Sequence, residues 1–352
     1  MDYETLTSAY LEIGKGIRCL LKEVKVGFIG CGERSQAHSE ALAEIPEVKL
    51  VSFCDILLER AKNLSEKYGG CAYLDYHEML DREDLDACYI AIPPFAHTDQ
   101  EISCCEKGIN FYVEKPVALT MEKAREIARY VEKSGVVTQV GYQTRFDTGH
   151  MRARDILHRE GGRIALIMSE MAIGRWIAPW WIKKEMSGGQ LVEQGTHEID
   201  LFRWYVGEVD KVFAEFDTLL NRGIPDFTIA DVSAVIFKFC NNALGVYSHV
   251  VLPFPMLPPR RRWMRYFEVV SENVEVTGQF GGPLKVFHEE KVEEFEFLPR
   301  EVTRQTDRHF IECVMRGKQT KVPYEEGVRT LEVSLAAVKA SETQKVIKLP
   351  LP

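Results

Sequence analysis

A glycine-rich stretch follows the first apolar run of the chain and consists of Gly30, Cys31, Gly32, Glu33, Arg34 and Ser35. Its spacing is that of a dinucleotide-binding loop, with a serine at the third glycine. Gly30 allows a tight turn, Gly32 lets the backbone approach a pyrophosphate, and the following helix offers unpaired N–H groups. Ser35 is small enough for close helix–strand packing. Glycines that merely turn the chain are the alternative, but the strand before and the helix after favour a dinucleotide site.

An acidic residue stands where such a site needs one. Asp55 ends the second apolar run, where a carboxylate can accept hydrogen bonds from both hydroxyls of a ribose. Its charge would repel a 2′-phosphate, which favours NAD over NADP. Arg60 lies one turn further along and keeps NADP open as the cofactor.

Lys115 could bind a reacting oxygen. It follows an apolar strand, at the edge where ligands lie in open α/β sheets, and Pro116 biases it away from helical geometry. An ammonium group there can stabilise developing alkoxide charge. The alternative is a solvated lysine at a strand end. Glu114, which precedes it, is interpreted as structural or as adjacent to the cofactor.

His197 could accept a hydroxyl proton near neutral pH. Glu193 lies four residues earlier, so on one helix the two share a face and the carboxylate can orient the ring. Asp200, three residues later, is another candidate partner. A core histidine bonded to the backbone is one alternative. A Glu/His metal pair is another, although the sequence offers no further ligands for it, and no metal is expected.

Other polar and aromatic residues flank these candidates. Arg145 leaves the last strand of the first region and could orient substrate or simply pair with a carboxylate. His97 could contact the cofactor or cap a helix, and His38 is interpreted as helix packing. Three tryptophans could form a platform for the C–H face of a sugar, or could belong to the core or to an interface: Trp176, Trp180 and Trp181.

Short apolar runs and helix-period segments alternate in the first part of the chain, which predicts a parallel sheet covered on both faces. The expected strands are Val24–Ile29, Val48–Cys54, Cys71–Tyr73, Ala87–Ile92, Asn110–Val113 and Val136–Val140. The expected helices are Ser35–Ile45, Leu57–Tyr68, Tyr76–Leu80, Thr98–Lys107 and Thr120–Ser134. This pattern is typical of a doubly wound (Rossmann) domain.

After about residue 145, strands follow one another without helices, which predicts an α+β domain with a large, mainly antiparallel sheet. Its expected strands are Ile164–Ile173, Val209–Leu219, Ile229–Cys240, Leu244–Leu252, Arg262–Val270, Leu284–His288 and Lys291–Phe297. Its expected helices are His150–Arg159, Leu191–Val206, Thr303–Arg316 and Glu325–Thr343. We therefore divide the chain into an N-terminal helical extension (1–22), a dinucleotide-binding domain (23–145) and a substrate-binding and oligomerisation domain (146–352).

Composition narrows the class of protein. The 352 residues are 45% hydrophobic and 28% charged, and the net charge of −9 argues against nucleic-acid binding. A local basic run at Arg260, Arg261, Arg262 and Arg265 is interpreted as a loop that enters a strand. Nine scattered cysteines without zinc spacing indicate reduced thiols in a cytoplasmic protein, and no apolar run is long enough to span a membrane.

Four segments together resemble the glucose–fructose oxidoreductase / inositol 2-dehydrogenase (Gfo/Idh/MocA) family, from Val24 to the C-terminus. They are VGFIGCGERSQAH at 26–38, IAIPPFAH at 90–97, VEKP at 113–116 and GGQLVEQGTHEIDLFRWYVGE at 188–208. Members place nicotinamide against the segment that corresponds to Ile92, Pro93, Pro94 and His97. They use the lysine of E-K-P and the histidine of an Asp-x-x-x-His pattern at the substrate, which here are Lys115 and His197. Glu193 stands where many members have aspartate.

The resemblance implies an NAD(P)-dependent dehydrogenase that moves a hydride between a nicotinamide cofactor and a secondary alcohol of a sugar, polyol or sugar derivative. It also implies a homodimer or homotetramer assembled across the second sheet. On this reading Lys115, His197 and Glu193 do the chemistry, and Arg145 and Trp181 help to bind substrate. Two alternatives stay open: a nicotinamide-dependent glycosidase or epimerase without net redox turnover, and a non-catalytic protein that senses the cofactor.

Overall fold

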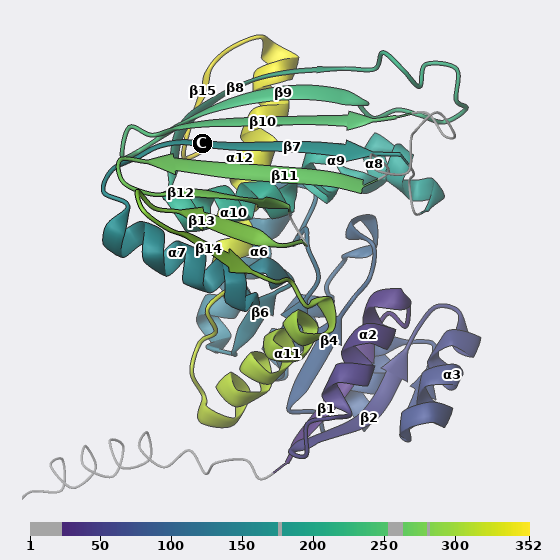
Figure 1. Ribbon diagram of the computed structural model, residues 1–352. Coiled ribbons are helices and arrows are strands. Elements are labelled where there is room, and N and C mark those ends of the chain that lie inside the picture. Colours follow the sequence, from purple (N-terminus) through teal and green to yellow (C-terminus); the bar gives the residue numbers. More distant parts are fainter. Residues whose placement is uncertain (1–22, 175–177, 253–262, 280–281) are drawn as a thin grey trace, which may run out of the picture.

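The computed structural model describes residues 23–174, 178–252, 263–279 and 282–352 (Figure 1). Three of the expectations above fall outside these residues: the N-terminal helix in 1–22, the arginines at 260–262, and Trp176. Within the described part of the chain, no helix is both long and apolar enough to cross a membrane.

The first sheet is parallel throughout and has the strand order β3-β2-β1-β4-β5-β6. Its strands are β1 (Val24–Ile29), β2 (Val48–Cys54), β3 (Cys71–Tyr73), β4 (Ala87–Ile90), β5 (Asn110–Val113) and β6 (Thr138–Val140). Five helices connect them: α2 (Glu33–Leu42), α3 (Leu58–Tyr68), α4 (Tyr76–Arg82), α5 (Gln100–Glu106) and α6 (Met121–Ser134). The predicted Rossmann fold is confirmed. Because all strands run one way, the residues that follow them gather at one edge of the sheet.

The second sheet has nine strands in the order β14-β13-β12-β11-β7-β10-β9-β8-β15. They are β7 (Ile164–Ile173), β8 (Val209–Asp217), β9 (Val232–Phe239), β10 (Leu244–Val251), β11 (Trp263–Ser271), β12 (Glu275–Gln279), β13 (Leu284–Phe287), β14 (Val292–Phe295) and β15 (Ile347–Lys348). All neighbours are antiparallel except β7 and β10. The predicted mainly antiparallel sheet is confirmed, although β12 and β15 were not predicted.

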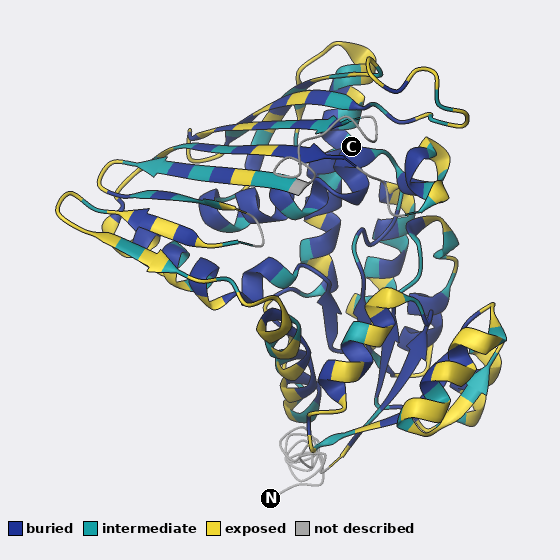
Figure 2. Cartoon of the chain, turned by 45° about the vertical axis from the view of Figure 1, so that its right-hand side comes forward, coloured by how far each residue is buried: buried dark blue, intermediate teal, exposed yellow. Residues whose placement is uncertain are grey.

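Helices cover one face of this sheet, as Figures 1 and 2 show. They are α7 (Thr148–Glu160), α10 (Thr196–Val206) and α12 (Tyr324–Thr343), and their apolar residues share one core with the inward side chains of the strands. The opposite face exposes alternate residues of β9 and β10, among them Ile236 and Val246, which are 54% and 38% exposed. Such alternation is typical of a sheet that is packed on one side only.

Helix α11 (Pro299–Arg316) returns to the first sheet although it belongs to the C-terminal part of the chain. It lies beside α2 (Figure 1), and the ring of Phe310 packs edge-on against Tyr89 at 5.6 Å and Tyr112 at 6.1 Å. The domain boundary that we predicted at residue 145 therefore assigns α11 to the second domain, although this helix covers the first sheet.

Candidate active site

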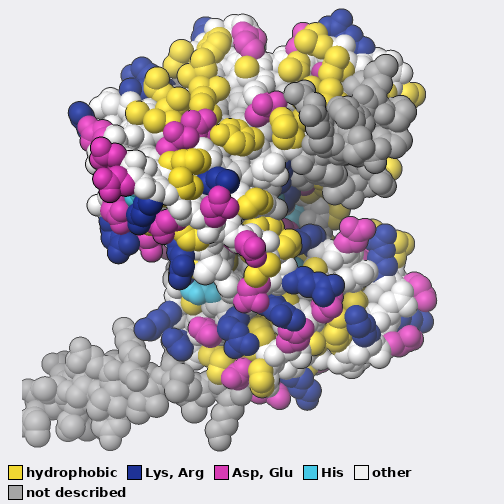
Figure 3. Space-filling view, viewed as in Figure 1, with side chains coloured by type: hydrophobic (Ala, Val, Ile, Leu, Met, Phe, Trp, Pro, Cys, Tyr) yellow, Lys and Arg dark blue, Asp and Glu magenta, His cyan; other side chains and the backbone are white. Residues whose placement is uncertain are grey.

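A cavity of about 730 Å³ opens where the carboxyl ends of the first sheet face the helices beneath the second. Figure 3 shows the surface indented between these two parts of the molecule, with acidic and basic side chains intermingled around it. Cavities of this size hold cofactors and substrates. Residues predicted from both parts of the sequence line it, among them Gly30, Cys31, Gly32, Arg34, Asp55, Arg60, Ile92, Pro93, Pro94, Glu114, Lys115, Trp181, Glu193 and His197.

The two glycines of the loop have different roles. Gly30 has φ +88°, and a Cβ there would lie 2.4 Å from the Ala91 carbonyl oxygen, so the turn needs glycine. Gly32 is the N-cap of α2, and a Cβ there would meet no atom within 4 Å. Since Gly32 lines the cavity, its missing side chain leaves room for a ligand beside the helix N-terminus. This cradle fits a pyrophosphate.

Ser35 lies beneath this loop. Its side chain is fully buried, and its hydroxyl donates a 2.6 Å hydrogen bond to the Gly30 carbonyl oxygen. Serine therefore braces the turn from below in place of the third glycine. Because Ser35 does not line the cavity, its assignment as a cofactor-contacting residue is corrected to one of support.

Asp55 joins the glycine loop to the end of β2. Its carboxylate accepts hydrogen bonds from the backbone N–H groups of Cys31 and Leu57, both at 2.8 Å, and it lines the cavity. These bonds fix the orientation of the carboxylate, and Arg60 lines the same cavity. Two apolar side chains that the sequence analysis missed also line it, Ile56 and Leu74, which are 87% and 55% exposed. Ile56 lies two residues after the end of β2 and Leu74 directly follows β3, which is the signal that could have found them.

The segment after β4 forms one wall. Ile92, Pro93 and Pro94 line the cavity, and Pro94 begins a 3₁₀ turn, η1 (Pro94–Ala96). His97 does not line it. Its Nδ1 lies 2.5 Å from a carboxylate oxygen of Glu101, and both side chains are almost completely buried. The assignment of His97 to the cofactor site is therefore corrected, since its ring is engaged within α5 and the turn before it.

Lys115 directly follows Glu114 at the end of β5. Its Nζ donates hydrogen bonds to the Glu193 carboxylate at 2.9 Å and to the Glu193 carbonyl oxygen at 2.8 Å. The ammonium group has three N–H donors, so within the described residues one stays available for a ligand in the cavity. Buried pairing with Glu193 also limits where that donor can point.

Glu193 and His197 do not share one helix, which is a third correction. The predicted helix Leu191–Val206 is interrupted, because α9 spans Gln190–Glu193 and α10 begins at Thr196. Gly195 lies in the break, and a Cβ there would be 2.7 Å from the Tyr247 hydroxyl. The break turns Glu193 towards Lys115. Gln194, which the sequence analysis missed, lines the cavity and donates a 2.6 Å hydrogen bond to the second Glu193 oxygen.

His197 lines the cavity from the first turn of α10, and the Tyr142 ring packs edge-on against it at 6.0 Å. Burial lowers the pKa of His197 well below its ordinary value of about 6.5, and the charges of Lys115 and Arg265 lower this pKa further. The imidazole is therefore neutral at neutral pH and can accept a proton. Lys115 and His197 line the same cavity.

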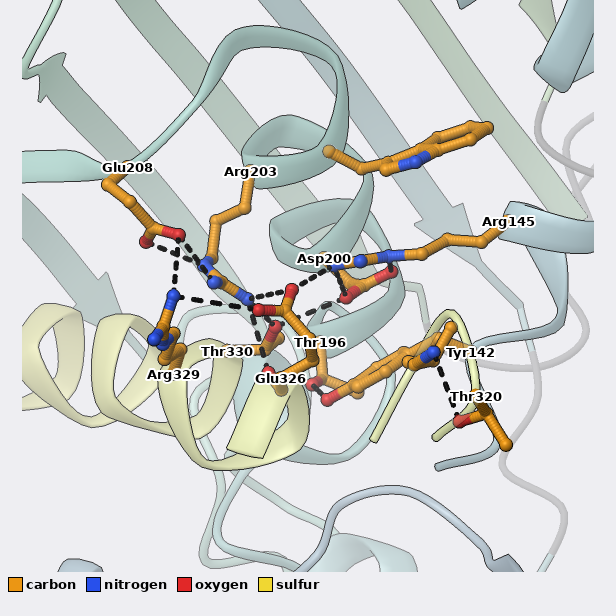
Figure 4. Close-up of polar contacts among 12 residues, drawn as sticks. Tyr142, Arg145, Thr196, Asp200, Arg203, Glu208, Thr320, Glu326, Arg329 and Thr330 are labelled. Carbon is orange, nitrogen blue, oxygen red and sulfur yellow. Dashed lines mark hydrogen bonds and ion pairs between the residues drawn. The ribbon is translucent and has the colours of Figure 1, made fainter. Parts of the chain in front are cut away.

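Arg145 lies outside the cavity. Figure 4 shows its guanidinium group facing Asp200 on α10, with hydrogen bonds of 2.9 and 2.7 Å, and it also donates to Glu326 at 3.0 Å. Arg145 and Asp200 are buried, and Glu326 is half-buried. The expectation that Arg145 binds substrate is therefore corrected in favour of its stated alternative, a carboxylate partner. Asp200 is taken by Arg145, which leaves it unsuited to orient His197.

Three side chains of one α10 face join this network. Thr196 contacts the Tyr142 hydroxyl at 2.7 Å, Asp200 binds Arg145, and Arg203 donates to Thr330 of α12 at 2.8 Å. Tyr142 and Arg145 come from the segment that follows β6 of the first sheet. The network therefore anchors the helix that carries His197 to the sheet that carries Lys115.

Aromatic side chains form the remaining wall. Trp180 and Trp181 of η3 (Pro179–Ile182) line the cavity with their rings nearly perpendicular. Trp180 also packs edge-on against Phe95 of η1 at 6.0 Å, which joins the two parts of the molecule. Gln143 lines the cavity as well, and its amide nitrogen donates to Glu114 at 3.2 Å.

Comparison with known proteins agrees with this arrangement. Residues 24–142 match the "Oxidoreductase family, NAD-binding Rossmann fold", and residues 150–252 match the "GFO/IDH/MocA C-terminal domain". The chain is 25% identical over 347 residues to the myo-inositol 2-dehydrogenase of Thermotoga maritima, which covers 93% of this chain and 98% of that protein. It is 26% identical over 343 residues to the scyllo-inositol 2-dehydrogenase (NAD(+)) of Bacillus subtilis, at 93% and 96% coverage.

Among solved structures, levoglucosan dehydrogenase in complex with NADH and levoglucosan superposes with a TM-score of 0.83, covering 94% of this chain and 100% of that one. At 20% identity this likeness shows the fold. The chain belongs to the Gfo/Idh/MocA oxidoreductase family, and its first sheet forms the NAD-binding Rossmann domain of that family.

Proposed function

We propose that the chain is an NAD-dependent dehydrogenase that oxidises a secondary alcohol of a sugar or polyol, and that it reduces the ketone in the reverse direction. The observation that carries this proposal is that one cavity is lined by the glycine loop, Asp55, Lys115 and His197. The glycine loop, Asp55 and Lys115 follow strands of the first sheet, His197 lies on α10 beside the second sheet, and the fold brings them together.

The cofactor would lie along the edge of the first sheet. Gly30, Cys31 and Gly32 suit its pyrophosphate, and Asp55 suits the adenosine ribose. A 2′-phosphate would face the Asp55 carboxylate, which supports NAD over NADP. When bound, the nicotinamide ring supplies a hydride acceptor, so the two electrons of the alcohol C–H bond leave the substrate carbon with that hydrogen.

Three side chains would serve the substrate oxygen. The neutral His197 ring accepts the hydroxyl proton, while the remaining N–H of Lys115 donates to the same oxygen and stabilises its developing negative charge. Glu193 holds Lys115 in place rather than orienting His197. In the reduction, the imidazolium form of His197 returns the proton to the oxygen.

The substrate class rests on the cavity and on the relatives. Several relatives are named for inositols and one solved neighbour for levoglucosan, all rich in hydroxyl groups. Here the amides of Gln143 and Gln194 line the cavity, and both NH₂ groups are already bonded to carboxylates. Their carbonyl oxygens are left as acceptors for hydroxyl groups. The Trp181 ring offers a surface for a C–H face.

The direct experiment is to incubate the purified chain with NAD and a panel of inositols, anhydrosugars and aldoses while following the absorbance of the reduced cofactor. We expect turnover with at least one member. Lys115→Ala and His197→Ala should each lower kcat at least about 1,000-fold. Retention of normal turnover by both variants would refute the assigned roles. NAD that copurifies without net turnover would instead support the glycosidase or epimerase alternative.

We also propose that the open face of the second sheet pairs with another copy of the chain. Exposed apolar residues lie there on the adjacent strands β9 and β10, and a further one on β11, beyond β7: Ile236, Leu244, Val246 and Tyr266. Exposed apolar surface of this kind is typical of protein interfaces. Light scattering should give the mass of a dimer or tetramer, and Ile236→Lys should lower it. A monomeric mass for the unmodified chain would refute this assembly.

A further inference from the structure

A buried histidine connects the cavity wall to helix α11. His38 on α2 has no exposed surface, and neither does its partner Asp307. The Nδ1 atom of His38 lies 2.8 and 3.0 Å from the two Asp307 oxygens, and its Nε2 lies 3.2 Å from a Glu114 oxygen. The two ring nitrogens therefore face carboxylates on opposite sides.

Two carboxylates require two donors. A neutral imidazole has one N–H, so one of its nitrogens would point a lone pair at a carboxylate oxygen. A doubly protonated ring donates on both sides, and the positive charge offsets the two buried negative charges. Burial alone would lower the pKa of His38, but the adjacent Asp307 charge and the hydrogen bonds to Asp307 and Glu114 raise this pKa above its ordinary value.

Most of the other groups around the ring fit this charge state, and one Arg34 contact fits a neutral ring instead. Arg34 donates to the same Glu114 oxygen at 2.9 Å, so two cations and two carboxylates balance one another. The Tyr89 hydroxyl donates to Asp307 at 3.2 Å, and the rings of Tyr89 and Tyr112 pack against the imidazole at 5.3 and 4.8 Å. The Arg34 Nη2 atom also lies 3.4 Å from His38 Nε2, which is the contact that a neutral ring would use.

Several contacts hold the Glu114 carboxylate in place, as they do the His38 ring. Its Oε1 accepts from Arg34, His38 and Gln143. A Cβ on Gly141 would lie 2.7 Å from its Oε2, so the glycine leaves the space that this carboxylate fills. Since Glu114 lines the cavity, the arrangement places an oriented carboxylate in the wall next to Lys115.

We propose that His38 is a positioning residue: held by Asp307, it stays doubly protonated and keeps Glu114 as an oriented carboxylate in the wall of the cofactor cavity. The proposal depends on cofactor binding and not on the substrate, so failure of the alcohol panel would leave it standing.

Nitrogen-15 NMR of histidine-labelled protein at pH 7.5, with the His38 signals assigned from the His38→Gln variant, tests the charge state. We expect both His38 nitrogens to be protonated, and Asp307→Asn to leave one of them bare. A single protonated nitrogen in the unmodified chain, with the other accepting from Arg34, would overturn the proposal.

Calorimetry of NAD⁺ binding tests the consequence. Glu114→Gln and His38→Gln should each weaken NAD⁺ binding about tenfold, and the double variant should be little worse than either single one. His158→Gln, at an exposed histidine on α7, is the matched control and should leave this affinity unchanged. Losses that add in the folded double variant would show that His38 does not act through Glu114 and would contradict the proposal.

Discussion

Replacing Arg145 with methionine separates two roles that the sequence leaves open for this residue. The structure pairs its guanidinium with Asp200, which is 1% exposed, through bonds of 2.9 and 2.7 Å. Removing one partner of a buried pair costs about 3–5 kcal/mol, because the other charge is left uncompensated. At about 2–4 °C per kcal/mol, the melting temperature should fall by roughly 10 °C.

The catalytic effect of Arg145→Met should appear in kcat. Asp200 lies one helical turn from His197, so a loosened α10 misplaces the proton acceptor, and kcat should fall about tenfold. The KM for the alcohol should stay within about twofold, because Arg145 does not line the cavity. The double variant Arg145→Met/Asp200→Asn should regain more than half of the lost stability, measured by thermal melting and urea titration. Unchanged stability with a strongly raised KM would show that Arg145 binds substrate and would refute this reasoning.

Three further predictions concern the cavity itself. The pKa of His197 is lowered and its neutral form accepts the proton, so kcat/KM for alcohol oxidation should fall only when the pH is lowered well below 6.5. A kcat/KM that already falls at or above pH 6.5 as the pH is lowered would contradict this role of His197. Gly32→Ala should weaken NAD binding about tenfold in calorimetry and leave the melting temperature unchanged, whereas Gly30→Ala should lower the melting temperature. If the two variants behave alike in both measurements, the proposed pyrophosphate cradle is contradicted. Asp55→Asn should lower the ratio of NAD affinity to NADP affinity about tenfold or more in binding titrations. An unchanged ratio would show that Asp55 does not select between the two cofactors.

The local sequence pattern was sufficient to predict the first sheet. Apolar strands separated by helices, with Gly30 and Asp55 at strand ends, predict both the fold and the position of the cofactor loop. Lys115 and His197 were found through the family resemblance, and the structure brings both to the same cavity.

The side-chain partners that the sequence pattern could not predict depend on contacts between segments that are distant in the sequence. Helical spacing predicted that Glu193 faces His197, but the helix is interrupted between Glu193 and Thr196, and the Glu193 carboxylate pairs with Lys115. His38 looked like a packing residue because its partner Asp307 is far away in the sequence. Arg145 looked available to substrate because Asp200 and Glu326 come together with it only in the folded chain.

The most direct test of the account is a crystal structure of the chain with NADH and a polyol that the panel shows to be oxidised. The account predicts one substrate oxygen within hydrogen-bonding distance of both the Lys115 ammonium and the His197 ring, with its carbon beside the nicotinamide. A substrate oxygen that contacts neither side chain, or only one of them, in that complex would contradict it.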